Sequence, residues 1–282
     1  MSVAPVVEAA RVRVTGATRL YAIVGDPIVQ VRSAEAFTQR FADEGIDAVL
    51  LPMQVSLDRV DTVIPGLMAL GNLDGLLVTA PLKETLARYA SRLGAAARCI
   101  GAVNALRREA DGSWSGDMFD GAGFVRGVER KGERLRGRRV LLFGAGGAGS
   151  AIACALAEAG VASIRIASPD PARGARLVAA VERAFPGCDV GSATAERDGI
   201  DMVVNASPVG MKPGDGLPGD IGPLAPHTLV GDVVVNEAPT ALIRQAIESG
   251  CPWADGRDMH AGQIDAIMTF LAPRRPGPRT GG

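Results

Sequence analysis

The chain has 282 residues, 47% of them hydrophobic and 22% charged, which is typical of an ordinary globular protein of about two domains. A net charge of −1 and an isoelectric point of about 6.2 argue against a strongly basic surface, so we expect neither nucleic acid nor a membrane surface as a partner. The sequence has no run of 18 apolar residues and no basic and apolar leader at its start, which predicts a cytoplasmic protein.

The cysteines and histidines are scattered, and no two cysteines form a C-x-x-C pair: Cys99, Cys154, Cys188, Cys251, His227 and His260. This pattern predicts no metal site and no disulfide framework, and it fits a reducing compartment. The last residues, 273–282, are rich in proline, glycine and arginine, so we expect them to be disordered. We expect a monomer or a homodimer.

The first third of the chain alternates short apolar runs with helical patterns. Strands are predicted at 20–25, 47–55 and 75–80, and helices at 34–45, 57–70 and 82–93. Phe37 and Phe41 lie four residues apart in the first helix, which ends at Gly45. The order β-α-β-α-β predicts a parallel sheet.

Lys83 is unusual because it falls in the first turn of the helix predicted after Pro81. Helix N-termini disfavour a positive side chain, typically by about 0.3–1 kcal/mol. A functional lysine and a solvated surface lysine are both open at this point.

The middle of the chain predicts a pair of strands within 99–120 around the turn 110–113, and then a helix at 122–131. A buried strand at 139–143 runs directly into Gly144, Gly146 and Gly149, in the spacing G-x-G-x-x-G. A helix then continues to Gly160, and the next strand is predicted at 163–168. A turn that binds nothing has the same glycines, but the complete β-α-β context favours a dinucleotide site.

Asp170 follows the glycines at about the distance expected of a carboxylate that binds the ribose of NAD. A solvated turn aspartate in the sequence SPDP is the alternative, and spacing alone leaves both open. Further strands are predicted at 201–207 and 228–235, and a last helix at 259–271. We expect this helix to return to the first domain. The predicted domains are then 1–120 with 256–282, which bind substrate, and 121–255, which binds dinucleotide.

Taken together, these motifs resemble the shikimate dehydrogenase family, which includes members that use quinate. The stretches that carry the resemblance are GDPIVQVRSAE, GLLVTAPLK, GAVNALRREADGSWSGDMFDGAGF, VLLFGAGGAG, VVNASPVGM and MHAGQ, in the family's order between about residues 20 and 271. The resemblance implies an α/β fold, with an N-terminal substrate domain around a mostly parallel sheet and a C-terminal Rossmann domain.

The resemblance also implies roles for individual residues. Lys83 and Asp120 match the catalytic pair, which exchanges a proton with a substrate hydroxyl. For Asp120 a helix N-cap is the alternative. Substrate contacts are implied for Ser33, Thr79, Asn104 and Gln263, although such residues could also satisfy backbone groups or face solvent. Cofactor contacts are implied for Gly144, Ala145, Gly146, Gly147, Ala148, Gly149, Asp170, Arg173, Asn205, Ala206, Gly256 and Met259. Met259 could instead belong to the core.

The sequence departs from the family at pocket positions that are usually polar. Val31 replaces a serine, Leu77 an asparagine and Val235 a tyrosine, and Met118 and Phe119 replace the pair Asn-Thr. Each lost partner would leave a substrate group unpaired, at about 1–3 kcal/mol. These departures raise the alternative of a family paralogue that acts on a less polar alcohol or ketone.

The residues after the second nucleotide strand also depart from the family, because Ser168, Pro169 and Asp170 stand where NADP-using members have Asn-Arg-Thr. Arg173 still matches the motif's later arginine, so NAD is predicted and NADP stays open. The predicted function is hydride transfer between nicotinamide and a ring hydroxyl or ketone of a cyclic hydroxy acid, as in aromatic amino acid biosynthesis. A non-catalytic NAD(P)-binding regulatory module is an alternative, and a folate-type dehydrogenase is disfavoured by the motif order.

Overall fold

The structure is a computed structural model that describes residues 13–29, 31–194, 199–212 and 214–273. It divides into two compact units, Met1–Leu82 with Ala272–Gly282 and Lys83–Leu271, which we describe one at a time. The functional boundaries predicted at residues 120 and 256 stay a prediction. The segment expected to be disordered, 273–282, lies outside the described residues except for Pro273.

The first unit contains a parallel sheet in the strand order β2-β1-β3, as the sequence predicts. Tyr21, Phe37 and Phe41 are buried between the sheet and α1, with the rings of Tyr21 and Phe41 4.9 Å apart. The elements are β1 (Arg19–Gly25), α1 (Ser33–Asp43), β2 (Ala48–Gln54), a 3-10 turn (Leu57–Arg59), α2 (Val60–Met68) and β3 (Leu73–Val78).

The second unit begins with four short elements, the first three of which fall where the sequence predicts one helix, 82–93. They are α3 (Lys83–Leu86), a 3-10 turn (Ala87–Tyr89), β4 (Arg92–Leu93) and α4 (Ala95–Ile100). The predicted helix is wrong because its second half pairs with a distant strand: the N–H of Ser91 donates to the carbonyl of Trp114 over 2.8 Å. The predicted strand pair is confirmed as the antiparallel hairpin β5 (Ala105–Arg108) and β6 (Trp114–Asp117).

The rest of the second unit is built on an all-parallel sheet in the order β12-β11-β10-β7-β8-β9. This order reverses between β7 and β10, which is the switch point where doubly wound sheets bind ligands. The sequence analysis does not predict β9, β12, α7 or α8. The elements are β7 (Arg139–Phe143), α6 (Gly147–Glu158), β8 (Ser163–Ala167), α7 (Pro171–Ala184), β9 (Asp189–Ser192), β10 (Met202–Asn205), β11 (Leu229–Asp232), α8 (Ala241–Glu248) and β12 (Trp253–Ala254).

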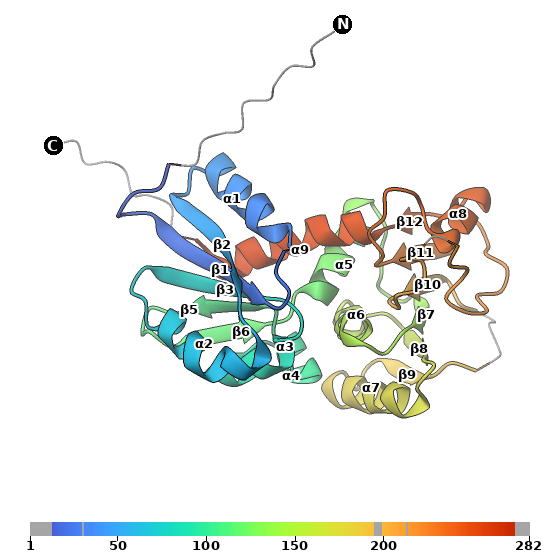
Figure 1. The fold of residues 1–282 in the computed structure, drawn as a ribbon. Helices are drawn as coiled ribbons and strands as arrows, with labels where there is room; N and C mark the ends of the chain where they lie inside the picture. Colours follow the sequence, from blue (N-terminus) through green and yellow to red (C-terminus); the bar gives the residue numbers. More distant parts are fainter. Residues whose placement is uncertain (1–12, 30, 195–198, 213, 274–282) are drawn as a thin grey trace, which may run out of the picture. The chain divides into compact units, whose positions relative to one another are not determined.

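Two helices of this unit, α5 (Asp120–Arg130) and α9 (Gly256–Leu271), lie side by side (Figure 1). Both begin two or three residues before the starts predicted from sequence. Glycines allow the contact, because a Cβ atom on Gly123 would lie 2.7 Å from the Cβ of Gln263, and one on Gly262 would strike the carbonyl of Gly123. The helix crossing therefore depends on the absence of side chains at these positions.

A disulfide joins Cys99 on α4 to Cys154 on α6, with the two Cα atoms 6.8 Å apart. The expectation of no disulfide is wrong for this pair, because 55 residues separate the two cysteines and only the packing of α4 on α6 brings them together. Cys188 and Cys251 are free and buried, and burial raises the pKa of both thiols.

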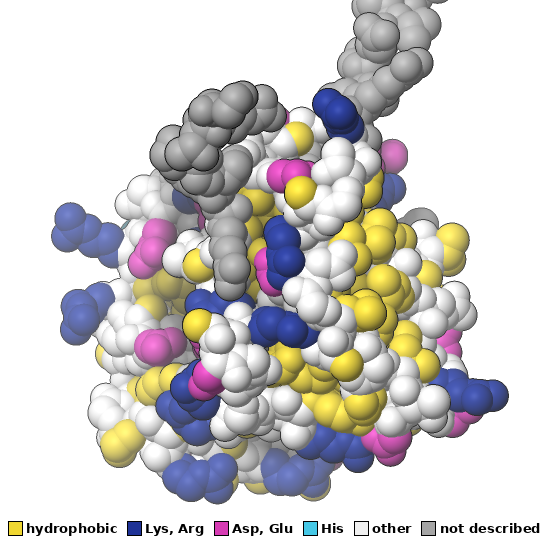
Figure 2. Space-filling model, turned by 90° about the vertical axis from the view of Figure 1, so that its left-hand side faces the viewer, with side chains coloured by type: hydrophobic (Ala, Val, Ile, Leu, Met, Phe, Trp, Pro, Cys, Tyr) yellow, Lys and Arg dark blue, Asp and Glu magenta, His cyan; other side chains and the backbone are white. Residues whose placement is uncertain are grey.

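The surface carries charges of both signs. On the face drawn in Figure 2, basic side chains are interspersed with acidic and apolar ones rather than gathered in one field. Across the ranges that the structure describes, no helix has the length and apolarity needed to cross a membrane, and no three metal-binding side chains come together.

Candidate active site

Lys83 and Asp120 form a close ion pair at the start of two helices of the second unit. Lys83 Nζ donates to Asp120 Oδ2 over 2.8 Å, and the side chains are 31% and 10% exposed. Because α3 has only four residues, its dipole is weak, and the carboxylate explains a lysine at its start better than solvent does. Asp120 is the first residue of α5 after the N-cap position, Phe119, and its side chain serves Lys83 rather than the helix cap.

The second oxygen of Asp120 is held by two amides. Asn104 Nδ2 donates to Oδ1 over 2.7 Å and Gln263 Nε2 over 2.6 Å. An ionised carboxylate only accepts hydrogen bonds, so three donors fix the Asp120 carboxylate in place. Hydrogen bonds to charged groups contribute about 1.5–3 kcal/mol each. Four residues predicted from sequence thus form one polar cluster.

The hairpin of β5 and β6 positions Asn104 directly, and it positions Lys83 through Val103, the residue before Asn104. The N–H of Asn104 donates to the carbonyl of Asp117, and Asn104 Oδ1 accepts the N–H of Phe119 over 2.8 Å. This second bond sets which way the amide of Asn104 points, since a backbone N–H can only donate. The N–H of Val103 donates to the carbonyl of Lys83 over 3.0 Å, which ties α3 to the hairpin.

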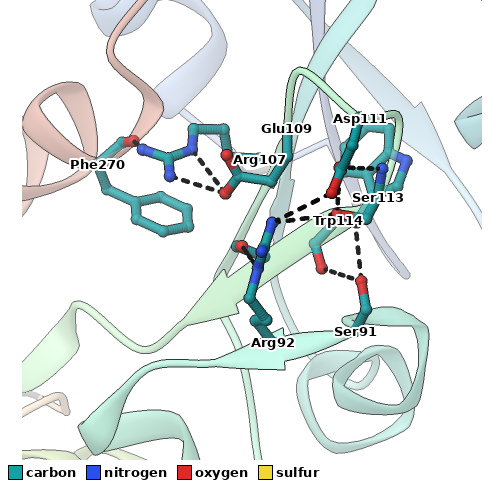
Figure 3. A network of polar contacts seen from close by, with 9 residues as sticks. Ser91, Arg92, Arg107, Glu109, Asp111, Ser113, Trp114 and Phe270 are labelled. Atoms are coloured by element: carbon teal, nitrogen blue, oxygen red, sulfur yellow. Dashed lines mark hydrogen bonds and ion pairs between the residues drawn. The ribbon is translucent and has the colours of Figure 1, made fainter.

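Gln263 is positioned by two contacts of α9, one near the centre of the helix and one at its C-terminal end. Near its centre, the glycine contact with α5 brings Gln263 against Gly123. At its C-terminal end, Arg107 on β5 donates to the carbonyl of Phe270 over 2.6 Å and pairs with Glu109, as Figure 3 shows. A guanidinium at helix carbonyls is favourable because those carbonyls carry partial negative charge.

Ser33 and Thr79, the other predicted substrate contacts, belong to the first unit. Ser33 is the first residue of α1. Thr79 follows β3 and donates its N–H to the carbonyl of Val24 over 2.9 Å. A side chain on Gly25 would strike the methyl group of Thr79, so that glycine makes room for it. Their contact with substrate stays a prediction.

The glycine turn after β7 has the geometry that a pyrophosphate needs. Gly144 has a φ of +105°, and a Cβ there would lie 2.7 Å from the carbonyl oxygen of Ala206. A Cβ on Gly149 would strike the carbonyl of Gly144, whereas Gly146 and Gly147 have nothing within 4 Å of an added Cβ. The N-terminus of α6 has neither a side-chain cap nor an acidic residue in its first turn. The turn therefore fits an anionic group against the helix.

Asp170 is the N-cap of α7 and accepts the N–H of Arg173 over 3.0 Å. This hydrogen bond lowers the pKa of Asp170. The structure thus gives Asp170 the turn role that the sequence leaves open, while its contact with a ribose stays a prediction. Arg173 is exposed in the first turn of the same helix.

Asn205 lies in a buried network that sequence analysis missed. Its amide donates to Asp232 Oδ1 over 3.0 Å and to the carbonyl of Val209 over 2.9 Å, and Asp232 Oδ2 accepts the hydroxyl of Thr240 over 2.7 Å. Burial raises the pKa of Asp232. This carboxylate holds the loops after β10 and β11 at the switch point. The sequence contains one indication of this network, because Asp232 is a charged residue inside the otherwise apolar run TLVGDVVV.

The structure supplies packing reasons for Gly256 and Met259. A Cβ on Gly256 would lie about 2.5 Å from the carbonyl oxygen of Val233. Met259 is partly buried and packs against the core that includes Phe124 and Ile152, which is the alternative left open for it. Their contacts with cofactor stay predictions.

The positions that depart from the family differ in environment. Leu77 and Met118 are buried, and Met118 packs in the small cluster with Ala102 and Ala151. Phe119, directly before Asp120, packs against Phe270, with the two rings tilted by 46° and their centroids 4.9 Å apart. Val235 is 60% exposed. Among these positions, Phe119 is the one that bonds to the polar cluster, because its backbone N–H donates to Asn104 Oδ1.

The strand order around the switch point and the glycine turn define a dinucleotide-binding α/β fold, and the comparisons with known proteins agree. The family model described as the shikimate dehydrogenase substrate binding domain matches residues 23–106. The shikimate dehydrogenase (NADP(+)) of Rubrobacter xylanophilus is 35% identical over 254 residues, 88% of each chain. The chain therefore belongs to the shikimate dehydrogenase family.

Two solved structures share the whole fold. The shikimate 5-dehydrogenase of Listeria monocytogenes, in complex with shikimate and NAD, has 30% identity and a TM-score of 0.85, over 93% of this chain and 94% of that one. The ligand-free 5-ketofructose reductase of Gluconobacter sp. strain CHM43 has 25% identity and a TM-score of 0.85, over 92% of this chain and 95% of that one.

Proposed function

We propose that the protein is an NAD(P)-dependent dehydrogenase of the shikimate or quinate type, which interconverts a ring hydroxyl and a ketone of a cyclic hydroxy acid. The observation that carries the proposal is the cluster in which Lys83, Asn104 and Gln263 all bond Asp120. Membership of the family and the glycine turn at the switch point support it.

In this proposal Lys83 and Asp120 move the proton of the reacting hydroxyl. Asn104 and Gln263 occupy Oδ1 of Asp120, so Oδ2, which accepts from Lys83, would be the oxygen that exchanges the proton. Lys83 is about one-third exposed and has three N–H donors, of which Asp120 takes one. The others are available to a substrate oxygen. A positioned acid–base pair contributes about 10²–10⁴-fold to the rate.

The bound nicotinamide cofactor would supply the hydride acceptor or donor. Gly144, Gly146, Gly147 and Gly149 would hold its pyrophosphate against α6, since no side chain obstructs the turn there. We propose NAD as the preferred cofactor because the carboxylate of Asp170 would repel a 2′-phosphate. NADP is the alternative cofactor, because the relative from Rubrobacter xylanophilus is named for NADP(+).

A second candidate function is favoured by Phe119. This residue directly precedes Asp120, and its apolar ring supplies no hydrogen bond where the family carries a polar side chain, which points to a less polar alcohol or ketone.

Initial rates of the purified protein test these proposals, with shikimate, quinate and the less polar cyclic alcohol cyclohexanol each assayed with NAD(H) and NADP(H). Turnover of shikimate or quinate, faster with NAD, supports the first function. Turnover of cyclohexanol alone supports the second. Cofactor binding without turnover across a wider panel of alcohols would contradict both and would favour a regulatory nucleotide-binding module.

A further inference from the structure

The disulfide between Cys99 and Cys154 joins two functional segments of the second unit. Cys99 lies near the end of α4, and the chain continues from there to Asn104, a donor to Asp120. Cys154 lies in the middle of α6, the helix that begins at the glycine turn. One covalent bond therefore ties the segment that positions the reacting pair to the helix of the dinucleotide site.

The two sulfurs differ in accessibility. Cys154 is 1% exposed and belongs to the hydrophobic core that packs on β7 and β8 of the all-parallel sheet. Cys99 is only partly buried and lines a hollow of about 280 Å³ beside α4 and α7. Thiol–disulfide exchange requires direct attack on a sulfur, so only Cys99 is open to an external thiol.

The hollow at Cys99 is positively charged. Arg98 and Arg183 both line it, and no carboxylate is among its lining residues. Both arginine residues are exposed, and the guanidinium of Arg98 also donates to the carbonyl of Leu93. A cleft with charge of one sign raises the association rate of ligands of the opposite sign.

From these observations we propose that Cys99–Cys154 is a thiol-exchange site that takes a small anionic thiol of the glutathione class through the hollow at Cys99. The incoming thiolate attacks Cys99 Sγ, the bond to Cys154 breaks, and the Cys154 thiolate takes the proton that the incoming thiol gave up. The product is a mixed disulfide on Cys99. A second thiol attacks the outer sulfur, releases the low-molecular-weight disulfide and leaves two free thiols. The reverse steps, driven by that disulfide as oxidant, restore the bond.

The test measures reduction rates of the full-length oxidised protein with glutathione and with the neutral thiol 2-mercaptoethanol. The variant carries Arg98→Glu and Arg183→Glu, neither of which belongs to the reacting cluster. We expect the rate with glutathione to fall about tenfold and the rate with 2-mercaptoethanol to stay unchanged. Because the neutral thiol reports on the accessibility of the bond, an equal fall with both thiols would indicate local misfolding and would contradict the electrostatic role.

Mass spectrometry of the trapped intermediate locates the attack. A single glutathione on the peptide that contains Cys99, with a free thiol on Cys154, is the expected result. An adduct on Cys154, or four free thiols in the denatured protein after treatment with glutathione disulfide, would overturn the proposal.

Discussion

Gln263 donates a hydrogen bond of 2.6 Å to Asp120 across 143 residues of sequence. This bond makes α9 part of the polar cluster around Asp120 although the helix lies at the end of the described chain. The other two donors to Asp120, Asn104 and Lys83, belong to segments much nearer to it in sequence. The geometry of the cluster therefore depends on how α9 packs on α5.

Replacing Gln263 with leucine should reduce kcat/KM by about tenfold to a hundredfold, because one hydrogen bond to a charged group contributes about 1.5–3 kcal/mol. Steady-state kinetics on the preferred substrate measures this loss. Gln245→Leu is the matched control, since Gln245 is a half-buried helical glutamine on α8. Equal activity of the two variants would show that the bond to Asp120 has no catalytic value.

Gly262→Ala should separate α9 from α5, because the new methyl group would strike the carbonyl of Gly123. We expect a loss of about 1–3 kcal/mol in the free energy of unfolding, as for overpacked cores, together with a fall in kcat. Urea unfolding and kinetics measure the two effects. Gly66→Ala is the control, since that helical glycine has nothing within 4 Å of an added Cβ and should gain stability. Unchanged stability of Gly262→Ala would contradict the tight crossing.

Asp170→Ser separates the two roles considered for Asp170. Serine is a good N-cap, so α7 should keep its stability while the negative charge is lost. The ratio of kcat/KM for NADP to that for NAD should rise about tenfold, which corresponds to ~1.4 kcal/mol. Asp170→Ala, which loses both cap and charge, should show the same ratio with lower thermal stability. An unchanged ratio of kcat/KM for NADP to that for NAD in both variants would show that Asp170 acts only as a helix N-cap.

The buried carboxyl of Asp232 predicts a pH dependence of stability. Burial raises its pKa above the ordinary 3.8, so the folded protein holds this proton more tightly than the unfolded chain does. Its contribution to the free energy of unfolding therefore falls as the pH rises from about 3.8 through the raised pKa. The difference in stability between wild type and Asp232→Asn should fall over this window.

Urea titrations between about pH 4 and about pH 8 measure that difference. The hydroxyl of Thr240 can accept from the new amide, so the variant is expected to fold. Asp189→Asn is the control. Its pKa is lowered by the hydrogen bond from Arg165, so its contribution is fully present above pH 3.8 and the corresponding difference should be flat. A flat difference for Asp232→Asn as well would contradict the effect of burial.

The sequence predicts most of what depends on local pattern and little of what depends on distant pairing. The alternation of apolar strands and amphipathic helices was sufficient for β1 to β3, and the glycine spacing for the turn after β7. The helix predicted at 82–93 failed because Ser91 pairs with Trp114, a contact that no local periodicity contains. The disulfide and the bond between Asn205 and Asp232 were missed for the same reason, since their partners lie 55 and 27 residues apart along the chain.

The resemblance to the family predicted all four members of the polar cluster, which are Lys83, Asn104, Asp120 and Gln263. Local sequence pattern alone indicated only Lys83, as a positive side chain in the first turn of a predicted helix. The structure adds the reason for their arrangement. Phe119, Gly123 and Gly262 set the backbone around Asp120, and none of them carries a chemical signal in the sequence.

The most direct test of the proposed mechanism compares Lys83→Met and Asp120→Asn with Lys131→Met. Lys131 is a close control because it forms an ion pair of 2.9 Å with Asp258 and its side chain is 34% exposed, against 2.8 Å and 31% for Lys83. The measurement is the initial rate with the preferred substrate, together with the dissociation constant of the cofactor by fluorescence. We predict a loss of at least about 100-fold in kcat for Lys83→Met and Asp120→Asn, with cofactor binding retained, and near-wild-type rates for Lys131→Met. Full activity in both site variants would contradict the account.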